Sequence, residues 1–511
     1  MIAKVNTLGL IGIDGIRMVL EADMNNGLPK VEIVGLPDAS VKESKERVKS
    51  AIKNSGLRFP ILHFTINLAP ASTKKQGPYY DLPMAVAILA CCGEIRNENL
   101  GEFTFVGELG LNGEIRKVDG VLPLLITARN EGLTKVFVPA DNAKEASFID
   151  GIDVYAVRHL TDVVEFLNGR KSLPTVSKSE FSYAQDSEVG PNDFCYIRGQ
   201  EKAKRAMEIS AAGGHNIMLI GPPGAGKTML AKSLPTILPK MTFQEALEVT
   251  KVHSIAGVLD STAGILSNRP FRTPHHTCTP ISLTGGGPKA TAGEISLAHN
   301  GVLFLDELPE YNRKTLETLR QPLEDGKITV ARAAISVTYP ADFMLVTSMN
   351  PCPCGNFGSK TRECRCSPAQ IHRYLSKLSG PLMDRIDVHV EMDSVNYEDL
   401  NSKQNLAECS RVVRERVDRA RNIQTNRFLG SKTTCNAKMT ADEVNKFCTL
   451  DEASDALLKQ AFDSFNLTAR SYTKILKVAR TIADLDSSPK IEVEHIAEAL
   501  SYRTLDKKYW I

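Results

Sequence analysis

The stretch that most limits the fold of this chain is residues 216–230, "NIMLIGPPGAGKTML". A short apolar run typical of a buried strand leads into G-x-x-x-x-G-K-T and then into a pattern typical of a helix. Glycines in such a turn let backbone N–H groups approach phosphate oxygens, and the helix N-terminus adds a favourable dipole. We therefore predict a P-loop, a site for the phosphates of ATP.

Each residue type in this loop has a role in binding ATP. The glycines admit the phosphates, Lys227 reaches the β- and γ-phosphates, and the Thr228 hydroxyl ligates Mg²⁺. The predicted loop comprises Gly221, Pro222, Pro223, Gly224, Ala225, Gly226, Lys227 and Thr228. The alternative, a chance glycine-rich turn, does not explain why a strand precedes the motif and a helix follows it.

A second apolar run, "GVLFLDEL", ends in the acidic pair Asp306 and Glu307. We expect Asp306 to hold Mg²⁺ through water, and Glu307 to orient or deprotonate the attacking water, as phosphoryl transfer to water requires. An acidic pair at the end of a strand is common in other proteins. Its meaning here depends on the P-loop that precedes it.

Length and patterning predict several domains in this chain of 511 residues. Residues 1–168 alternate strand and helix patterns, which indicates an α+β domain, and the polar residues 169–193 indicate a linker. Residues 194–395 interleave apolar strands with helices, which indicates an α/β layer. Residues 396–511 are helical in pattern. We expect a multidomain α/β and α+β protein with an all-α C-terminal domain.

Composition restricts the location of the protein and its binding sites. The formal net charge is only +2, so any site for a polyanion must be local. The first residues lack the continuous apolar segment of a signal peptide, and no apolar run approaches the roughly 20 residues of a membrane span. Five of the 11 cysteines stand singly, which fits a reducing compartment better than a disulfide framework. We expect a cytoplasmic protein with no membrane partner.

Four cysteines form two C-x-C pairs in residues 352–366: Cys352, Cys354, Cys364 and Cys366. Four thiolates fill a tetrahedral Zn²⁺ site and leave no open position, which favours structural zinc over a catalytic metal. The C-x-C spacing is tighter than the usual C-x₂-C. Redox-active disulfides or buried thiols therefore remain as alternatives.

Several motifs together resemble one family of ATPases. They are "GQEKAKRAMEISAAGGHNIMLIGPPGAGKTMLA", "FRTPHHT", "NGVLFLDELPE", "NPCPCG" and "SGPLMDRIDVHVEM". This combination is similar to the magnesium-chelatase-related branch of the AAA+ ATPases, and over essentially the whole chain it resembles the YifB/ComM group. The resemblance implies an AAA+ core with helix-2 and pre-sensor-1 insertions, followed by a helical lid.

The same resemblance implies roles for three further residues. Asn350 corresponds to the sensor-1 residue that contacts the γ-phosphate or the attacking water. Arg385 corresponds to an arginine finger delivered to a neighbouring subunit, which implies a homo-hexameric ring, and Arg470 to a sensor-2 arginine of the lid. The alternatives are an intrachain ion pair of Arg385 with Asp384 or Asp387, and a surface position for Arg470.

The N-terminal domain resembles the Lon protease domain, which has a ribosomal-S5-like fold. In that resemblance Tyr79 stands at the serine position and Leu122 at the lysine position. A Ser–Lys mechanism needs a hydroxyl nucleophile and an amine that takes its proton, so we expect a binding or assembly module instead of a peptidase. Asp81 marks either a surviving polar site or a helix N-terminal acid stabilised by the dipole.

Two insertions are candidates for DNA contact: residues 281–296 with Lys289, and the hairpin pattern that starts at residue 327 and carries Arg332. Resemblance to the MCM ring helicases implies that insertions at these places touch DNA, and single cations on small loops suit backbone phosphates. The alternative is packing between subunits. Six arginines between residues 411 and 427 indicate a solvated helix face or a subunit interface more than a DNA patch.

The resemblance implies an ATP-driven helicase that acts on single-stranded, forked or branched DNA. Its implied process is branch migration in recombination or natural transformation, with recombination proteins as partners. Two alternatives stay open, which are a chelatase-like or protein-remodelling ATPase and a Lon-like ATP-dependent protease.

Overall fold

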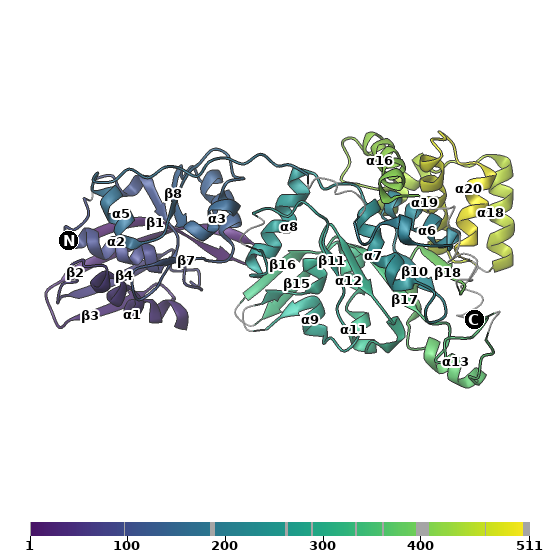
Figure 1. The fold of residues 1–511 in the computed structure, drawn as a ribbon, viewed down its shortest axis with the longest axis horizontal. Coiled ribbons are helices and arrows are strands. Elements are labelled where there is room, and N and C mark those ends of the chain that lie inside the picture. Colours follow the sequence, from purple (N-terminus) through teal and green to yellow (C-terminus); the bar gives the residue numbers. More distant parts are fainter. Residues whose placement is uncertain are drawn as a thin grey trace. The chain divides into compact units, whose positions relative to one another are not determined.

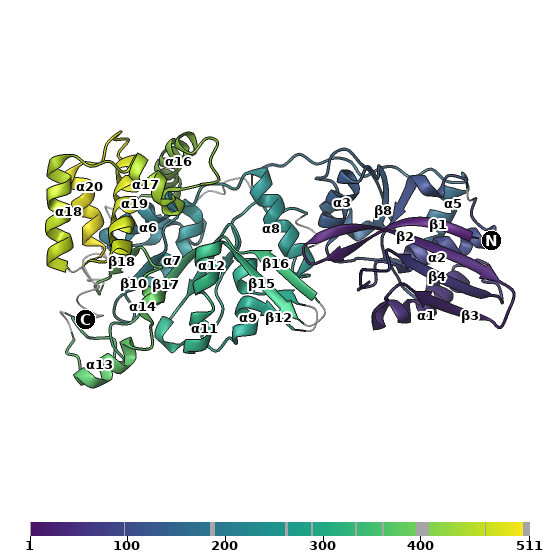
Figure 2. The same ribbon diagram turned by 180° about the vertical axis from the view of Figure 1, so that it is seen from behind.

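The computed structural model describes residues 2–96, 98–183, 190–260, 264–287, 290–332, 335–359, 362–394, 408–465 and 467–503. Its contacts divide the chain into two compact units (Figures 1 and 2). The first unit comprises Met1–Ser182, Phe243–Ser267 and Ala331–Tyr339. The second unit comprises Tyr183–Thr242, Asn268–Val330 and Pro340–Ile511. Within the described residues, no helix is both long enough and apolar enough to span a membrane.

The first unit is built on a seven-stranded sheet in the order β3-β4-β2-β1-β5-β8-β9. Its strands are β1 (Ile2–Ile11), β2 (Asp14–Asn25), β3 (Lys30–Val34), β4 (His63–Ala69), β5 (Phe103–Phe105), β8 (Lys135–Pro139) and β9 (Asp153–Val157). Its helices before residue 170 are α1 (Ala39–Asn54), α2 (Asp81–Cys91), α3 (Val121–Asn130), α4 (Ala143–Ala146) and α5 (Leu160–Leu167). All 11 residues of α2 are buried, because this apolar helix packs between α1 and strands β1 and β2.

A small hairpin of this unit turns at Gly113. Strand β6 (Glu108–Leu109) pairs antiparallel with β7 (Ile115–Arg116). Gly113 has a φ of 87°, in the left-handed region that glycine adopts without a steric penalty.

Segments from the middle of the chain also belong to the first unit. Helix α8 (Phe243–Ile255) packs against α3. The Ser254 hydroxyl accepts a hydrogen bond from the Gly120 N–H at 3.0 Å and donates to the buried carboxylate of Glu145, which also accepts from the Leu122 N–H at 3.0 Å. These polar groups satisfy one another, so α8 is an integral part of this unit.

The second unit contains a parallel sheet in the order β11-β14-β17-β10-β18. Its strands are β11 (Phe271–Arg272), β14 (Val302–Leu305), β17 (Met344–Met349), β10 (Ile217–Ile220) and β18 (Val388–Glu391). All residues of β10, β14 and β17 are buried, as their apolar runs predicted. Since the strands are parallel, the residues that follow each strand gather at one edge of the sheet.

Helices and short hairpins surround this sheet. The helices are α6 (Glu201–Gly213), α7 (Lys227–Ile237), α9 (Pro280–Thr284), α10 (Glu294–Leu297), α11 (Arg313–Glu317), α12 (Arg320–Asp325), α13 (Pro368–Leu375) and α14 (Gly380–Met383). Strand β12 (Gly285–Gly286) pairs antiparallel with β13 (Thr291–Ala292) in the second unit. A further hairpin pairs β15 (Lys327–Arg332) with β16 (Ile335–Pro340), and its residues Ala331–Tyr339 belong to the first unit (Figure 2). The second hairpin confirms the prediction from residue 327 onward.

The C-terminal region is helical, as predicted. Its helices are α16 (Ser410–Arg427), α17 (Ala441–Phe447), α18 (Glu452–Phe465), α19 (Ala469–Leu485) and α20 (Val493–Ser501). Helix α16 packs against α6, α7 and α19, which makes it part of the second unit. The mixed α/β architecture with a helical C-terminal region therefore agrees with the sequence.

Four of the six arginines of α16 have partners within the chain. Arg416 pairs with Glu208 at 2.5 Å, Arg427 pairs with Asp484, and two others donate to backbone carbonyls. Those two are Arg414, to the Thr236 carbonyl, and Arg421, to the Ala211 carbonyl. These four arginines are engaged within the chain, which favours a structural role for the arginine-rich segment over contact with DNA.

A buried ion pair connects Asp387, the residue before β18, with helix α19 of the C-terminal region. Lys474 of α19 lies 2.8 Å from Asp387, and both side chains are only 13% exposed. His215 lies 3.4 Å from the same carboxylate. Burial opposes the charged form of Asp387, but Lys474 and His215 outweigh it and hold the pKa of Asp387 well below its ordinary value.

Replacing Lys474 by Met is expected to destabilise the protein by about 3 kcal/mol at pH 7, because a buried carboxylate loses its cation. The folded pKa of Asp387 is depressed. The contribution is therefore present above the unfolded pKa of about 3.9 and lost as the pH falls below it. Urea unfolding should thus show a difference between variant and wild type that shrinks below about pH 4. Lys490→Met, at an exposed position, is the control, and equal stability of Lys474→Met and the control would refute the role of the pair.

Candidate functional site

The P-loop lies between β10 and α7, as the sequence predicted. Gly224 and Gly226 have φ values of 81° and 88°, so both glycines occupy the left-handed region. Helix α7 begins at Lys227, and its first N–H groups have no carbonyl partner within the helix. The loop and the helix N-terminus together provide backbone donors that suit phosphate oxygens.

Lys227 connects this loop with the strand beside it. Its ammonium donates to the carbonyls of Gly221 and Pro222 at 2.7 and 2.9 Å, and to the Asn350 side chain at 3.0 Å. Burial lowers the pKa of Lys227, while Asp306 and Glu307 oppose that shift. Asn350 directly follows β17. The structure therefore brings the predicted sensor residue to the predicted phosphate-binding lysine.

Thr228 and Asp306 also meet at this edge of the sheet. The Thr228 hydroxyl donates to Asp306 Oδ2 at 2.8 Å, while Oδ1 accepts from the Ser348 hydroxyl and from the Glu307 N–H at 3.1 Å. A hydroxyl and a carboxylate in contact supply the hard oxygen ligands that Mg²⁺ prefers. The residues present thus fit a magnesium site next to the P-loop.

Glu307 adopts a backbone conformation that is uncommon for its residue type. Its φ is 53°, and its side chain is 57% exposed. A left-handed non-glycine residue is costly and is found often at functional sites. Its carboxylate lies 4.0 Å from His276 Nδ1 and is otherwise open to solvent, so Glu307 is available to a water molecule at the sheet edge.

Two residues of this site were not singled out from the sequence. Ser348 precedes Asn350 by two positions, so strand alternation places both on one face, and this signal could have identified it. His276 belongs to "FRTPHHT", which carried the family resemblance but was given no role.

The four predicted cysteines come together in the second unit. Their Sγ atoms all lie within 4.8 Å of one another, and three of the separations are 3.4, 3.7 and 3.7 Å. A tetrahedral zinc with Zn–S bonds of about 2.3 Å places its sulfurs about 3.8 Å apart, whereas a disulfide needs about 2.05 Å. The thiols are free, and their arrangement fits a structural zinc ion.

Backbone groups donate hydrogen bonds to sulfurs of this cluster and favour the thiolate form of Cys354. The Phe357 N–H donates to Cys352 Sγ at 3.3 Å. Hydrogen bonds from the backbone of Asn356 and Arg365 lower the pKa of Cys354 to about 6. Thiolates are the form that binds metal, and such N–H···S contacts orient them.

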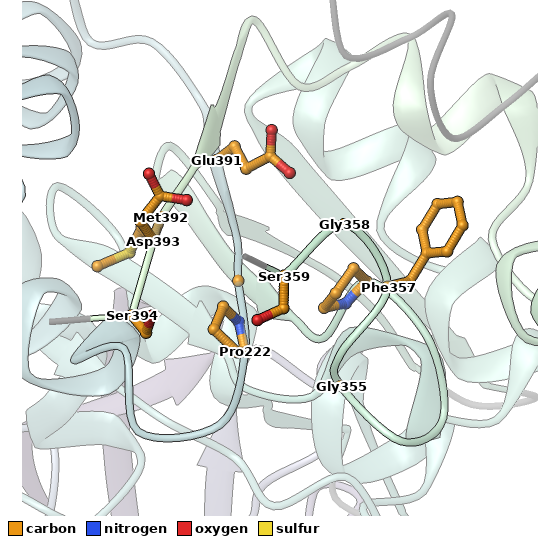
Figure 3. A pocket seen from close by; sticks show the side chains of 11 residues that line it. Pro222, Gly355, Phe357, Gly358, Ser359, Glu391, Met392, Asp393 and Ser394 are labelled. Carbon is orange, nitrogen blue, oxygen red and sulfur yellow. The ribbon is translucent and has the colours of Figure 1, made fainter. Parts of the chain in front are cut away.

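The cysteine loop also lies against the P-loop. Gly355 has a φ of 79°, and a Cβ atom at this position would lie 2.4 Å from Pro223 Cδ. A cavity of about 110 Å³ adjoins this contact. Figure 3 shows its lining from three segments, which are the start of the P-loop, residues 355–359 and residues 391–394. A metal bound by the cysteines would therefore also hold the cavity-lining residues 355–359 in place beside the P-loop.

Arg385 and Arg470 share one partner, Glu324 of α12. Arg385 Nη2 lies 2.5 Å from Glu324 Oε1, and Arg470 pairs with the same oxygen. The intrachain partner of Arg385 is thus neither of the two acids considered from the sequence. Both arginines thus pair with Glu324, and among the described residues no contact joins either of them to Lys227.

The residues at the protease-like positions form no catalytic pair. Leu122 is 1% exposed, and its N–H donates to Glu145. Asp81 is buried and pairs with Arg47 at 2.8 Å, while it also accepts from the Leu109 N–H at 3.2 Å. Burial raises the pKa of Asp81, and Arg47 opposes that shift. Asp81 is therefore a structural group in a closed ion pair, and it is not an open polar site.

Of the two predicted DNA-contact residues, the structure describes only the backbone of Arg332. Lys289 lies outside the described residues, within the connection between β12 and β13. Arg332 is the last residue of β15, and its side chain lies outside the description. Their contact with DNA stays a prediction.

A parallel sheet of order β11-β14-β17-β10-β18, with a P-loop, an acidic strand end and an asparagine at one edge, defines an ATPase of the AAA+ class. Family models agree with this class. "Magnesium chelatase, subunit ChlI" matches residues 193–400, "Subunit ChlI of Mg-chelatase" matches 20–142, and "Magnesium chelatase, subunit ChlI C-terminal" matches 407–503. The chain belongs to the YifB/ComM family of magnesium-chelatase-related AAA+ ATPases.

Similar proteins come from several organisms. The YifB protein of Salmonella typhimurium is 41% identical over 508 residues, which covers 99% of this chain and 98% of that protein. The competence protein ComM of Haemophilus influenzae has the same identity and coverage. The DNA replication licensing factor mcm-6 of Caenorhabditis briggsae is 20% identical over 324 residues, which covers 59% of this chain and 34% of that protein.

Proposed function

We propose that this chain is the subunit of a homo-hexameric ring motor that hydrolyses ATP and acts on DNA. The observation that carries the hydrolytic part is the meeting of Lys227 with Asn350 and of Thr228 with Asp306. The similarity to a competence protein and to a DNA replication licensing factor supports DNA as the polymer. We propose a helicase that promotes branch migration during recombination or natural transformation in the cytoplasm.

Each residue of the site has its own role in the proposed hydrolysis of ATP. The P-loop N–H groups and Lys227 bind the phosphates, and Glu307 holds the attacking water and accepts its proton. Mg²⁺, when bound by Thr228 and Asp306, would neutralise charge on the phosphate oxygens. Asn350 orients the γ-phosphate or the water. We propose that Arg385, as an arginine finger, and Arg470, as the sensor-2 residue, complete the site.

The N-terminal unit serves binding or assembly in this proposal. Its Lon-protease-like, ribosomal-S5-like character rests on sequence resemblance, and Tyr79 and Leu122 offer neither a serine nor a lysine for peptide cleavage. The zinc ion proposed at the cysteine cluster is structural. Proteins of recombination are the proposed partners.

The principal alternative is a chelatase-like motor that remodels a protein. It uses the same ATPase residues and differs only in the polymer or partner engaged. Lys289 and Arg332, repeated around a ring, would bind backbone phosphates without reading sequence, so DNA binding should weaken steeply with salt.

ATP turnover with and without DNA separates the two proposals. The rate should rise on adding single-stranded, forked or three-stranded DNA, and more than on adding blunt duplex. Lys289→Ala/Arg332→Ala should lose this rise and keep the basal rate. If no DNA structure raises the turnover of a confirmed hexamer, the DNA motor is refuted and the protein-remodelling motor is favoured.

Arg385→Ala is expected to keep ATP binding and to lose at least ~100-fold in ATP turnover of the assembled ring, as loss of a finger does elsewhere. Mixing it with Glu307→Gln subunits should restore part of the turnover, because each variant supplies the group that the other lacks. Arg58→Ala, at an exposed position of the first unit, is the control. If mixed rings recover no activity although rings with diluted wild-type subunits do, action between subunits is disproved.

A further inference from the structure

Glu324 is a charged residue outside the P-loop site that pairs with two arginines and carries no assigned role. One of its carboxylate oxygens contacts Arg385 Nη2 at 2.5 Å and also contacts Arg470 Nη2. The two arginines come from α19 and from the turn after α14. Two cations from separate elements therefore converge on one anion.

Arg385 is held more tightly than a surface arginine. Its side chain is 9% exposed, and its Nε donates to the Arg320 carbonyl at 3.0 Å. Its Nη1 donates to the Pro381 carbonyl. Arg320 and Glu324 are one turn apart on α12, so a single helix face receives the guanidinium. Arg385 thus has a fixed position that depends on α12.

The carboxylate allows the two arginines to lie together. Two guanidinium groups that share one contact atom repel each other unless an anion stands between them. The contact with Arg385, followed by that with Arg470, lowers the pKa of Glu324 and keeps it ionised at neutral pH. Without this charge, the Arg470 side chain, which is 48% exposed, would turn into solvent.

Helix α12 also leads directly into the β15–β16 hairpin. Gly326 ends the helix with a φ of 63°, and its N–H donates to the Pro322 carbonyl at 2.9 Å. Ala341, after the hairpin, donates to the Gly326 carbonyl at 2.8 Å. The residues that flank the hairpin, Gly326 and Ala341, are therefore hydrogen-bonded to each other at the C-terminal end of α12, the helix that carries Glu324.

We propose that Glu324 is a positioning residue that holds Arg385 and Arg470 as one unit for the nucleotide bound by a second copy of this chain. This inference rests on the proposed function, in which Arg385 serves a neighbouring subunit. It adds that Arg470 acts jointly with Arg385, and that α12 sets the place of both arginines.

The test compares Glu324→Gln with Asp325→Asn, a change of the next acid on the same helix. Glu324→Gln should lower kcat of the assembled ring by roughly tenfold, with KM, ring assembly and melting temperature unchanged. Glu324→Asp should recover part of the rate, and Asp325→Asn should match the wild type. In an Arg385→Ala/Arg470→Ala background, Glu324→Gln should have no further effect, because its role passes through those arginines.

Three outcomes would overturn the proposal. A wild-type kcat for Glu324→Gln would show that turnover does not depend on the carboxylate positioning Arg385 and Arg470. A lowered melting temperature or loss of rings would mark it as merely structural. A kcat defect of the same size in the Arg385→Ala/Arg470→Ala background would show action independent of the arginines. If that background itself turned over like the wild type, the arginine roles in the proposed function would fail, and the inference with them.

Discussion

Glu307→Gln is expected to bind ATP with nearly wild-type affinity and to hydrolyse it at least ~100-fold more slowly, since a glutamine accepts no proton from the attacking water. Lys227→Ala should instead lose nucleotide binding, because its ammonium is the charged group next to the phosphates. The two variants thus separate binding from chemistry. Fluorescent-nucleotide titration and phosphate release measure both quantities on the same sample.

A change of a nearby acid serves as the control for this pair. Glu310→Gln, at the end of the short 3₁₀ helix Leu308–Glu310, should leave both measurements unchanged, because its carboxylate pairs with Lys377 at 3.5 Å. If Glu307→Gln hydrolysed ATP at the wild-type rate, another residue would have to activate the water. The assignment of Asp306 to magnesium would then need a separate test.

Purified protein is expected to contain about one Zn²⁺ per chain, and Cys352→Ser or Cys364→Ser should abolish it. Structural zinc contributes roughly 10–16 kcal/mol of binding free energy at pH 7 in small domains, so its loss should unfold the loop that contacts Pro223. We expect a lowered melting temperature and weaker nucleotide binding. Metal analysis under reducing, chelator-free conditions and calorimetry measure the two effects.

The matched control for the metal is Cys92→Ser, which alters a thiol of the first unit and should retain the zinc. Acidification should release the ion from the wild type, since protonated thiols do not bind it. If the wild-type protein contained no zinc and kept its full stability, structural zinc at the four cysteines would be refuted. The four thiols would then have to be explained as buried or redox-active groups.

Local motifs predicted the parts of the site that lie within one stretch of sequence. The P-loop, the strand ending in Asp306 and the two C-x-C pairs each combine residue type with spacing, and the chemistry follows from both. The role of Asn350 came only from family resemblance, and its contact with Lys227 was not predicted. That contact depends on strand order, which local periodicity does not specify.

The contacts that sequence reasoning missed join distant segments. Glu324 stands on an ordinary helix, and nothing in its neighbours indicates that it meets Arg385 and Arg470. Likewise, the hydrogen bonds of Ser254 to Gly120 and Glu145 place α8 in the first unit, although α8 follows the P-loop helix in the chain. Such pairings depend on tertiary packing, which cannot be predicted from local periodicity.

Strand displacement on forked and three-stranded DNA is the decisive measurement for an ATP-driven DNA motor. We predict that the wild-type ring displaces a strand with ATP and Mg²⁺ and does not do so with ADP or a non-hydrolysable analogue. Glu307→Gln rings should bind the DNA without displacing it. Displacement that is equal with and without hydrolysis, or none by a hexamer that hydrolyses ATP at full rate, would refute the DNA motor.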